Sequence, residues 1–132
     1  MKFLVYFFWT CLLILQACTF TASDSKSDFK ISPKDLIGKT IEYRYGESIY
    51  HVTLDTDSKM HWEAMAGDEK GALEDETYII ESVDDSKMLI TWGEANGIGV
   101  SQVLDFEKGI VYNHLLRGRD LTIGRGEIKI LP

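Results

Sequence analysis

Apolar and polar residues alternate along the chain from Thr40 onward, and short stretches rich in Gly, Asn and Asp interrupt this alternation about every ten residues. Alternate side chains of a β-strand point to opposite faces, so the pattern predicts antiparallel strands joined by hairpins. Facing residues of a hairpin must lie on the same face, and the apolar positions therefore determine the length of each loop. A consistent set of loop lengths would indicate one shared inner face.

Four loops meet this condition. Gly46 and Glu47 would form a two-residue turn, and a Gly at the first position suits a type II′ turn. Residues 56–58, 84–86 and 95–97 would form three-residue loops, and in the last of these Gly97 occupies a left-handed position. On the outer side, His51 would then face Glu63. The facing pairs predicted for the inner face are Ile41 with Val52, Tyr43 with Tyr50, Val52 with Trp62, Tyr78 with Trp92, Ile80 with Ile90, and Trp92 with Val100.

Two further loops, at 107–109 and 117–120, bring the number of expected strands to eight. Eight short antiparallel strands with tight connections are about the number that closes into a barrel. The predicted fold is therefore all-β, an eight-stranded antiparallel up-and-down barrel. A cap residue, Pro33 and a closing Gly predict one short helical turn over 32–38. The stretch 66–75 is the one long loop expected, a candidate lid. A two-sheet sandwich is the alternative, and it would need longer crossing connections.

The N-terminal segment has the composition of a secretory signal. Lys2 precedes an apolar run from Phe3 to Leu15 that is too short for a membrane span. The segment 15–18 resembles a bacterial lipobox, in which the cysteine is lipidated after cleavage; the alternative is cleavage nearby with Cys18 left as a free thiol. We therefore expect a signal peptide over 1–17, a lipid-anchored flexible tether over 18–36 and the barrel domain over 37–132.

Charge and cysteine content restrict the partners. The formal net charge of -7 argues against nucleic acid and anionic lipid, because both are bound through an excess of Lys and Arg. We expect secretion across the inner membrane and a place in the bacterial cell envelope, in the outer membrane or the periplasm, with the lipid anchor as the only membrane contact. Cleavage would remove Cys11 and leave one cysteine, so no internal disulfide could form. The oligomeric state stays open.

The predicted inner face collects aromatic side chains near a carboxylate. Tyr43 and Tyr45 lie two residues apart on one strand, and Glu94 is one inner position beyond Trp92. A pocket with apolar walls and a few convergent polar groups suits small-molecule recognition. The alternative is a dry, packed core with tyrosine hydroxyls and Glu94 at a solvated rim. The residues expected to line the pocket are Tyr43, Tyr45, Trp62, Tyr78, Trp92 and Glu94.

The remaining polar residues give weaker signals. His51 and His61 fall on the outer face without a third ligand, and His114 is not assigned to either face, so no metal site is expected. Burial in the pocket would raise the pKa of Glu94, and Glu76, which the register sets opposite it, would strengthen that effect. The acidic clusters, residues 74–76 among them, are expected to mark solvated loops. No phosphate-binding loop, nucleophile elbow or Cys-x-x-Cys motif occurs, and no cofactor is expected.

Four segments resemble the MoaF-like domain, a lipocalin-type or calycin barrel: IGKTIEYRYGESIYHVTL, MHWEAMAG, ETYII and LITWGEANGIGVSQVLDF. The resemblance covers Ile37 to about Phe106 and implies an eight-stranded barrel with a central cavity. It implies no particular activity.

A more distant resemblance is to phenolic acid decarboxylases, barrels that remove carbon dioxide from hydroxycinnamic acids without a cofactor. In that family a tyrosine pair holds the substrate carboxylate, and an Arg and a Glu complete the site. Tyr43 and Tyr45 match the tyrosine pair, and Glu94 matches the acid. Lys70 stands in the region of the Arg, whose planar fork it cannot reproduce, and Ala95 replaces the Pro that follows the Glu. The resemblance implies only a conditional catalytic role for Tyr43, Tyr45 and Glu94.

Taken together, these features predict a cell-envelope lipoprotein whose barrel binds a small aromatic or apolar molecule, with no catalysis expected. One alternative is a cofactor-free lyase acting on phenolic acids. Another is a protein-interaction module whose barrel is solid and whose loops meet the partner.

Overall fold

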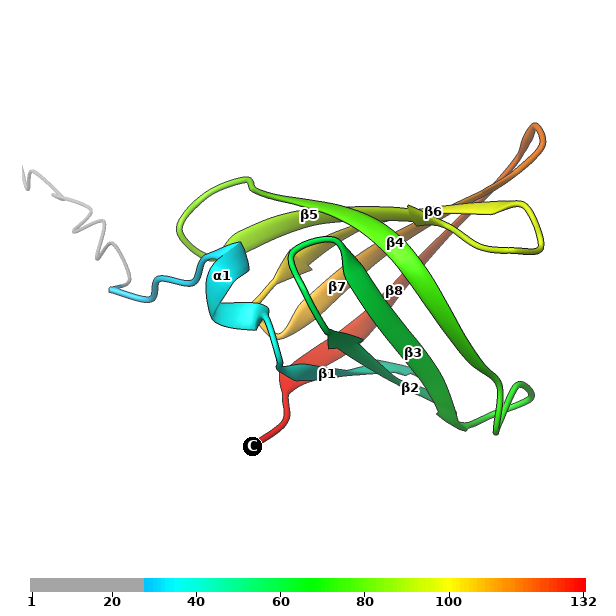
Figure 1. The fold of residues 1–132 in the computed structure, drawn as a ribbon, viewed down its shortest axis with the longest axis horizontal. Helices are drawn as coiled ribbons and strands as arrows, with labels where there is room; N and C mark the ends of the chain where they lie inside the picture. Colours follow the sequence, from blue (N-terminus) through cyan, green and yellow to red (C-terminus); the bar gives the residue numbers. More distant parts are fainter. Residues whose placement is uncertain (1–27) are drawn as a thin grey trace, which may run out of the picture.

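The computed structural model describes residues 28–132 (Figure 1). The predicted signal peptide, the lipidation site at Cys18 and most of the predicted tether lie outside the described residues. Within the described part, no helix has the length and apolar character needed to cross a membrane.

The described chain forms one short helix followed by eight strands. The helix α1 spans Pro33–Leu36, and the strands are β1 (Thr40–Tyr45), β2 (Ser48–Leu54), β3 (Lys59–Ala66), β4 (Leu73–Ser82), β5 (Lys87–Gly93), β6 (Ile98–Asp105), β7 (Ile110–Arg117) and β8 (Asp120–Ile130). Each strand pairs with the next in antiparallel fashion, and β1 pairs with β8 to close the barrel (Figure 1). The predicted up-and-down barrel with a helical turn is confirmed.

The hairpin registers follow the alternation of the sequence. All the predicted inner pairs are observed, and His51 faces Glu63 on the outside. Gly46 has a φ of 59° and Gly97 a φ of 86°, and no described residue other than glycine has a positive φ. Glu47 therefore keeps a negative φ at the second turn position, which a type II′ turn allows and a type I′ turn does not.

One loop is shorter than predicted. The stretch 66–75 was expected as a long loop, but β3 continues to Ala66 and β4 already begins at Leu73. Residues 73–75 pair with β3, and Glu74 faces Trp62 across the ladder. The prediction that residues 74–76 form a solvated loop is wrong because pairing with β3 decides their conformation, whatever the β-propensity of charged residues. Glu74 and Glu76 consequently point into the barrel.

The two ends of the barrel differ in packing. The helix α1 lies at one end, and the connections from β1 to β2, β3 to β4, β5 to β6 and β7 to β8 lie at the other (Figure 1). Ser32 donates its backbone N–H to the Asp35 carboxylate at 2.8 Å, which caps the helix and seats Leu36 on the core. The side chains that are at most 1% exposed near this end are Leu36, Ile41, Leu54, Met60, Met88, Leu104 and Val111.

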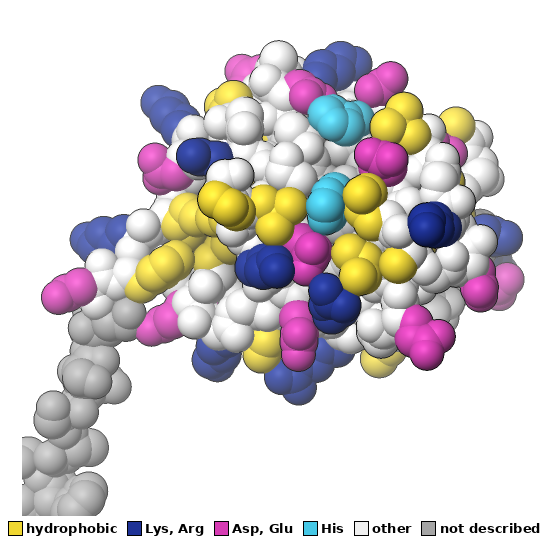
Figure 2. All heavy atoms as spheres, turned by 90° about the horizontal axis from the view of Figure 1, so that it is seen from below, with side chains coloured by type: hydrophobic (Ala, Val, Ile, Leu, Met, Phe, Trp, Pro, Cys, Tyr) yellow, Lys and Arg dark blue, Asp and Glu magenta, His cyan; other side chains and the backbone are white. Residues whose placement is uncertain are grey.

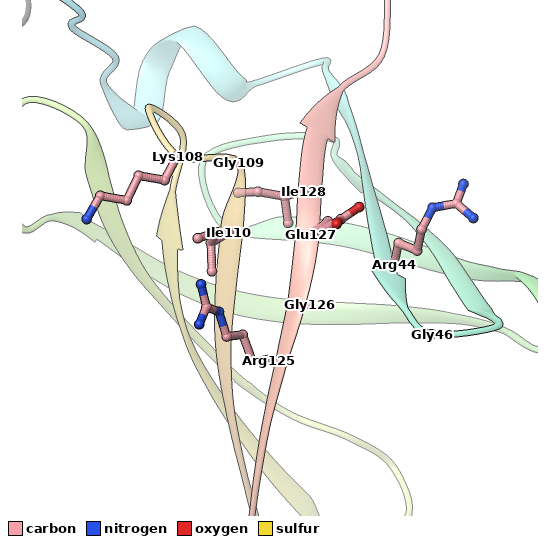
Figure 3. A pocket seen from close by; sticks show the side chains of 9 residues that line it. All are labelled: Arg44, Gly46, Lys108, Gly109, Ile110, Arg125, Gly126, Glu127 and Ile128. Atoms are coloured by element: carbon pink, nitrogen blue, oxygen red, sulfur yellow. The ribbon is translucent and has the colours of Figure 1, made fainter.

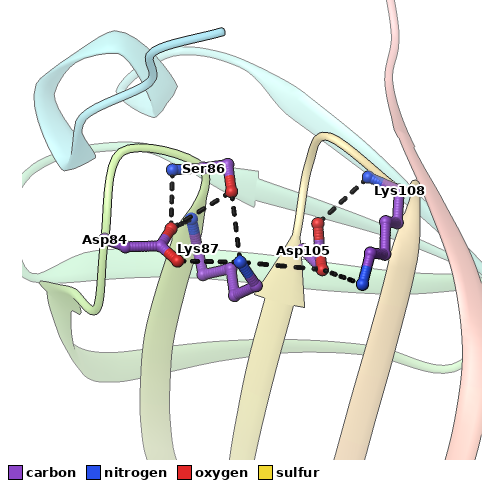
Figure 4. A network of polar contacts seen from close by, with 5 residues as sticks. All are labelled: Asp84, Ser86, Lys87, Asp105 and Lys108. Atoms are coloured by element: carbon purple, nitrogen blue, oxygen red, sulfur yellow. Dashed lines mark hydrogen bonds and ion pairs between the residues drawn. The ribbon is translucent and has the colours of Figure 1, made fainter. Parts of the chain in front are cut away.

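The end of the barrel at which α1 lies is called the closed end below. Polar contacts there hold the β4–β5 loop against the β6–β7 loop (Figure 4). Asp84 accepts the backbone N–H groups of Ser86 and Lys87 at 2.8 Å each and the Lys87 ammonium at 2.7 Å. Asp105, which is 2% exposed, accepts the Lys108 N–H at 3.0 Å and lies 4.0 Å from the Lys87 ammonium. The Lys87 ammonium and the Ser86 N–H hold the pKa of Asp84 well below its ordinary value.

Candidate functional site

A cavity of about 400 Å³ lies within the barrel, lined by strand residues and by four residues of the loops opposite α1. Seven strands, β1 to β7, contribute to its wall together with residues of the β3–β4 and β5–β6 loops. Alternation sends every second side chain of each strand inward, so residues far apart in the sequence meet there. Five of the predicted wall residues line the cavity, namely Tyr43, Tyr45, Trp62, Trp92 and Glu94.

Tyr78, the sixth predicted wall residue, is buried but is not among the residues that line the cavity. Its hydroxyl donates to the backbone carbonyl of Thr56 at 2.7 Å, in the loop between β2 and β3. Burial, with the charges of Asp57 and Asp55, raises the pKa of Tyr78. Its hydroxyl therefore holds a loop at the closed end.

Aromatic rings form one side of the cavity. The ring centroids of Tyr45 and Tyr50 lie 6.3 Å apart with an interplanar angle of 69°, and those of Tyr50 and Trp62 lie 6.0 Å apart at 72°. Such edge-to-face contacts are a favoured geometry for aromatic pairs. Burial raises the pKa of Tyr45 well above its ordinary value and the pKa of Tyr50 to about 12. Both hydroxyls are therefore protonated at neutral pH and can donate a hydrogen bond.

Three carboxylates line the cavity, those of Glu69, Glu74 and Glu94. Glu69 accepts the Tyr50 hydroxyl at 2.6 Å, and Glu94 accepts the Asn96 amide at 3.0 Å. Burial raises the pKa of Glu94, and the charges of Glu74 and Glu69 add to the rise while the Asn96 bond opposes it. The expected direction of this shift is therefore confirmed.

Glu76 lies beside these carboxylates, although it is not among the residues that line the cavity. Burial is the main cause that raises its pKa to about 7, followed by the neighbouring Glu74 carboxylate and the charge of Glu94. In the folded protein, Glu76 therefore holds its proton more tightly than an ordinary glutamate does. Glu69, Glu74, Glu76 and Glu94 together can hold more negative charge than one arginine can neutralise, and Arg117 is the one basic residue that lines the cavity.

Five buried polar atoms of the cavity wall have no hydrogen-bond partner: Tyr43 Oη, Trp62 Nε1, Trp92 Nε1, Glu74 Oε2 and Gln102 Oε1. Folded proteins leave few such atoms, because a buried polar group without a partner costs about 1–3 kcal/mol. Here the atoms belong to side chains that border a cavity, where a ligand or ordered water can supply the missing partners.

The polar residues of β6 and β7 were missed by the sequence analysis. Gln102 is 5% exposed and donates its amide to Asn113 at 3.0 Å and to the Tyr45 hydroxyl at 3.3 Å. Gln102 lies two residues from Val100 and two from Leu104, so it faces the same inner side as they do. This spacing could have identified Gln102 as an inward residue from the sequence. Arg117 carried no such signal, because the register of β7 could not be derived from a neighbouring apolar pattern.

The histidines lie outside the cavity. His51 is 3.3 Å from the Glu42 carboxylate, and His61 is 2.8 Å from that of Asp55. Both lie on the outer surface, and Figure 2 shows histidine side chains among charged and apolar neighbours on the face seen from below. His114, whose face the sequence left open, is exposed. Residues 28–132 contain no group of three or more His, Cys, Asp or Glu side chains that could hold a metal ion.

A second hollow, of about 770 Å³, lies over β1, β7 and β8 (Figure 3). Its cationic side chains point in different directions, and each has a partner elsewhere. Arg44 lies 3.2 Å from the Glu42 carboxylate, and the Lys108 ammonium lies 4.0 Å from the Asp105 carboxylate. The guanidinium carbon of Arg125 lies 5.6 Å from the centroid of the Tyr112 ring. Although this hollow is the larger one, it offers no convergent group for a ligand.

Comparisons with known proteins agree with the fold. The family model described as MoaF-like matches residues 37–129. No curated protein matches the chain. Sixteen chains of solved structures match it. One of them, from Burkholderia vietnamiensis and described as a "putative beta-lactamase", is 24% identical with a TM-score of 0.67, over 73% of this chain and 95% of the other. At this identity, the likeness shows a shared fold alone.

Proposed function

Because the chain belongs to the MoaF-like family and its barrel encloses a cavity, we propose that it is a cell-envelope lipoprotein that binds a small molecule with an aromatic or apolar body. The observation that carries this proposal is the cavity wall itself, which combines aromatic rings with buried polar atoms that lack partners. Such a wall can hold a ligand by apolar burial and orient it by a few hydrogen bonds.

The size of the cavity supports the proposal that it binds a small molecule. Small-molecule sites commonly enclose about 300–1,000 Å³, and the cavity of about 400 Å³ lies in the lower part of that range. Each Å² of apolar ligand surface removed from water contributes roughly 25 cal/mol. The solid-barrel alternative has less support, because a solid barrel would leave no space between Tyr43, Trp62 and Trp92.

The anchor is the second part of the proposal. A lipidated Cys18, followed by the segment expected to be a tether, would hold the barrel close to a membrane surface of the cell envelope, without inserting it. The support is the lipobox-like segment that ends at Cys18. Incorporation of radiolabelled palmitate should be lost in Cys18→Ala, and incorporation by both proteins or by neither would contradict the anchor.

Native mass spectrometry tests the binding proposal. Protein purified without denaturation should carry a small molecule that is released on unfolding. Ala72→Trp, which places an indole at the cavity wall, should abolish that adduct. The matched control is Ile79→Trp, because Ile79 is 71% exposed and is not among the cavity residues. A wild-type protein without any adduct, or an adduct that survives Ala72→Trp, would contradict the proposal.

A second candidate is a cofactor-free lyase acting on phenolic acids. The observation that favours it is that Tyr43, Tyr45 and Glu94 line one cavity together with Arg117. Arg117 is a cation from β7 in place of the arginine for which the sequence offered only Lys70. Glu94, with its raised pKa, would be the proton donor. Incubation with p-coumarate should then yield 4-vinylphenol and carbon dioxide, and a protein that forms neither is no such lyase.

A further inference from the structure

We propose that the ligand of this cavity is an organic cation, whose protonated amine is held between the aromatic rings and the glutamates of the wall. This inference rests on the proposed function, because it names the chemical class of the molecule bound in the same cavity.

The first argument is charge. Glu69, Glu74 and Glu94 line the cavity, whereas Arg117 is the one basic side chain among its lining residues. Within residues 28–132, none of these three glutamates forms an ion pair with a Lys or Arg. The donors that bind Glu69 and Glu94 are neutral: the Tyr50 hydroxyl donates to Glu69 and the Asn96 amide to Glu94. A ligand cation would supply the missing opposite charge, and a carboxylate ligand would add to the repulsion.

The second argument is independent of charge and comes from the buried atoms that lack partners. Glu74 Oε2 is buried, and the neighbouring group that can share a proton with this carboxylate is the Glu76 carboxyl, so once Glu76 is ionised Glu74 can accept an ammonium N–H. Tyr43 is 1% exposed and Trp62 is 8% exposed, and neither the Tyr43 hydroxyl nor the Trp62 indole N–H has an acceptor. A ligand that also carries an acceptor, such as a hydroxyl or carbonyl oxygen, would satisfy these two donors.

The third argument is the arrangement of the rings. Tyr45, Tyr50 and Trp62 follow one another at near-perpendicular angles, 69° and 72°, so their faces do not stack on each other. The face of an aromatic ring attracts a cation, most strongly for Trp, by about 0.5–2 kcal/mol. Tyr50 connects both elements of the site, because its ring lies between the other two and its hydroxyl binds Glu69.

Three probes that share a phenol ring and differ in charge test the inference. Tyramine is a cation at pH 7.5, tyrosol is neutral and 4-hydroxyphenylacetate is an anion. Isothermal titration calorimetry with the purified protein should give an affinity for tyramine about tenfold or more above that for tyrosol, since tenfold corresponds to about 1.4 kcal/mol. The anion should bind more weakly than tyrosol.

Two variants assign the effect to the site. Glu74→Gln and Glu94→Gln should each lower the affinity for tyramine about threefold to tenfold, and they should lower the affinity for tyrosol by a smaller factor. Glu81→Gln is the matched control, because Glu81 is an exposed residue of the same strand, β4, and its substitution changes the net charge by the same amount. An equal loss in the control would show a general charge effect and overturn the inference. The wild-type ratio of tyramine to tyrosol needs no variant to fold.

The outcomes separate this inference from the proposed function. If tyrosol or 4-hydroxyphenylacetate binds as tightly as tyramine, the ligand class is wrong while the binding function stands. If none of the three probes binds, the molecule released in native mass spectrometry decides: an amine or ammonium compound supports the inference, and a neutral or acidic compound overturns it. If no probe binds and no molecule is released, both proposals fall.

Discussion

Glu74 and Glu76 lie two residues apart on the inner face of β4, and one carboxylate oxygen of each is buried without a hydrogen-bond donor. Burial is the main cause that raises the pKa of Glu76 to about 7. The next cause is the Glu74 carboxylate, with which Glu76 can share a proton. The folded protein therefore holds this proton more tightly than the unfolded chain does. The resulting stabilisation is fully present below about pH 4.5 and is lost as the pH rises through 7.

Glu76→Gln should stabilise the protein at alkaline pH. The amide is neutral and can donate to Glu74, so the free energy of unfolding at pH 8 should rise by on the order of 1–2 kcal/mol. At pH 5, where Glu76 is largely protonated, the variant and the wild type should be equally stable. Denaturant titrations at both pH values measure the difference, and an equal change at the two would contradict the origin assigned to the shift.

Gly126→Ala should strain the seam that closes the barrel. A methyl group at Gly126 would lie 2.6 Å from the backbone oxygen of Arg44 and 2.7 Å from the Tyr45 ring. Because a backbone atom cannot move aside cheaply, we expect a loss of about 1–3 kcal/mol in thermal unfolding. The control is Gly124→Ala on the same strand, whose methyl group would meet only the Asn113 side chain at 4.0 Å. Similar losses in both variants would show that strand propensity, not the seam, is responsible.

Two tyrosine variants separate the binding role from the structural one. Tyr78→Phe removes the bond to the Thr56 carbonyl and should cost about 1 kcal/mol of stability without changing ligand affinity. Tyr43→Phe removes a buried hydroxyl that has no partner, so stability should be unchanged or slightly higher while ligand affinity falls. Calorimetric melting and ligand titration of both proteins check the pair. A destabilised Tyr43→Phe variant would indicate a protein partner for that hydroxyl.

Asp84→Asn should weaken the closed end in a pH-dependent way. The pKa of Asp84 is depressed by the Lys87 ammonium and the Ser86 N–H, so its carboxylate stabilises the fold above about pH 4, and this contribution is lost as the pH falls through the folded-state value. The variant should unfold more easily than the wild type at pH 7, and the gap should narrow in acid. Asp68→Asn, in the exposed β3–β4 loop, is the control, and it should show no gap.

The alternation of residues in the sequence was enough to predict each hairpin. Tyr43 opposite Tyr50 and Trp92 opposite Val100 are pairs separated by a single turn, so loop length and side-chain parity determine their register locally. The same reasoning placed Trp62 on the inner face and the histidines of β2 and β3 on the outer one. These are short-range relationships, and no knowledge of the closed barrel is needed to obtain them.

Tertiary structure decided which inward residues form the site. The sequence analysis assigned Glu74 to a loop and overlooked Gln102 and Arg117. It also counted Tyr78 among the wall residues, although Tyr78 does not line the cavity. Each of these outcomes depends on contacts with strands that are distant in the sequence. Whether an inward side chain is packed or borders a cavity depends on what faces it from across the barrel, and α1 covers one end alone. Alternation determines whether a side chain faces the inside or the outside of the barrel, whereas the pairing of β1 with β8 determines which residues an inward side chain contacts.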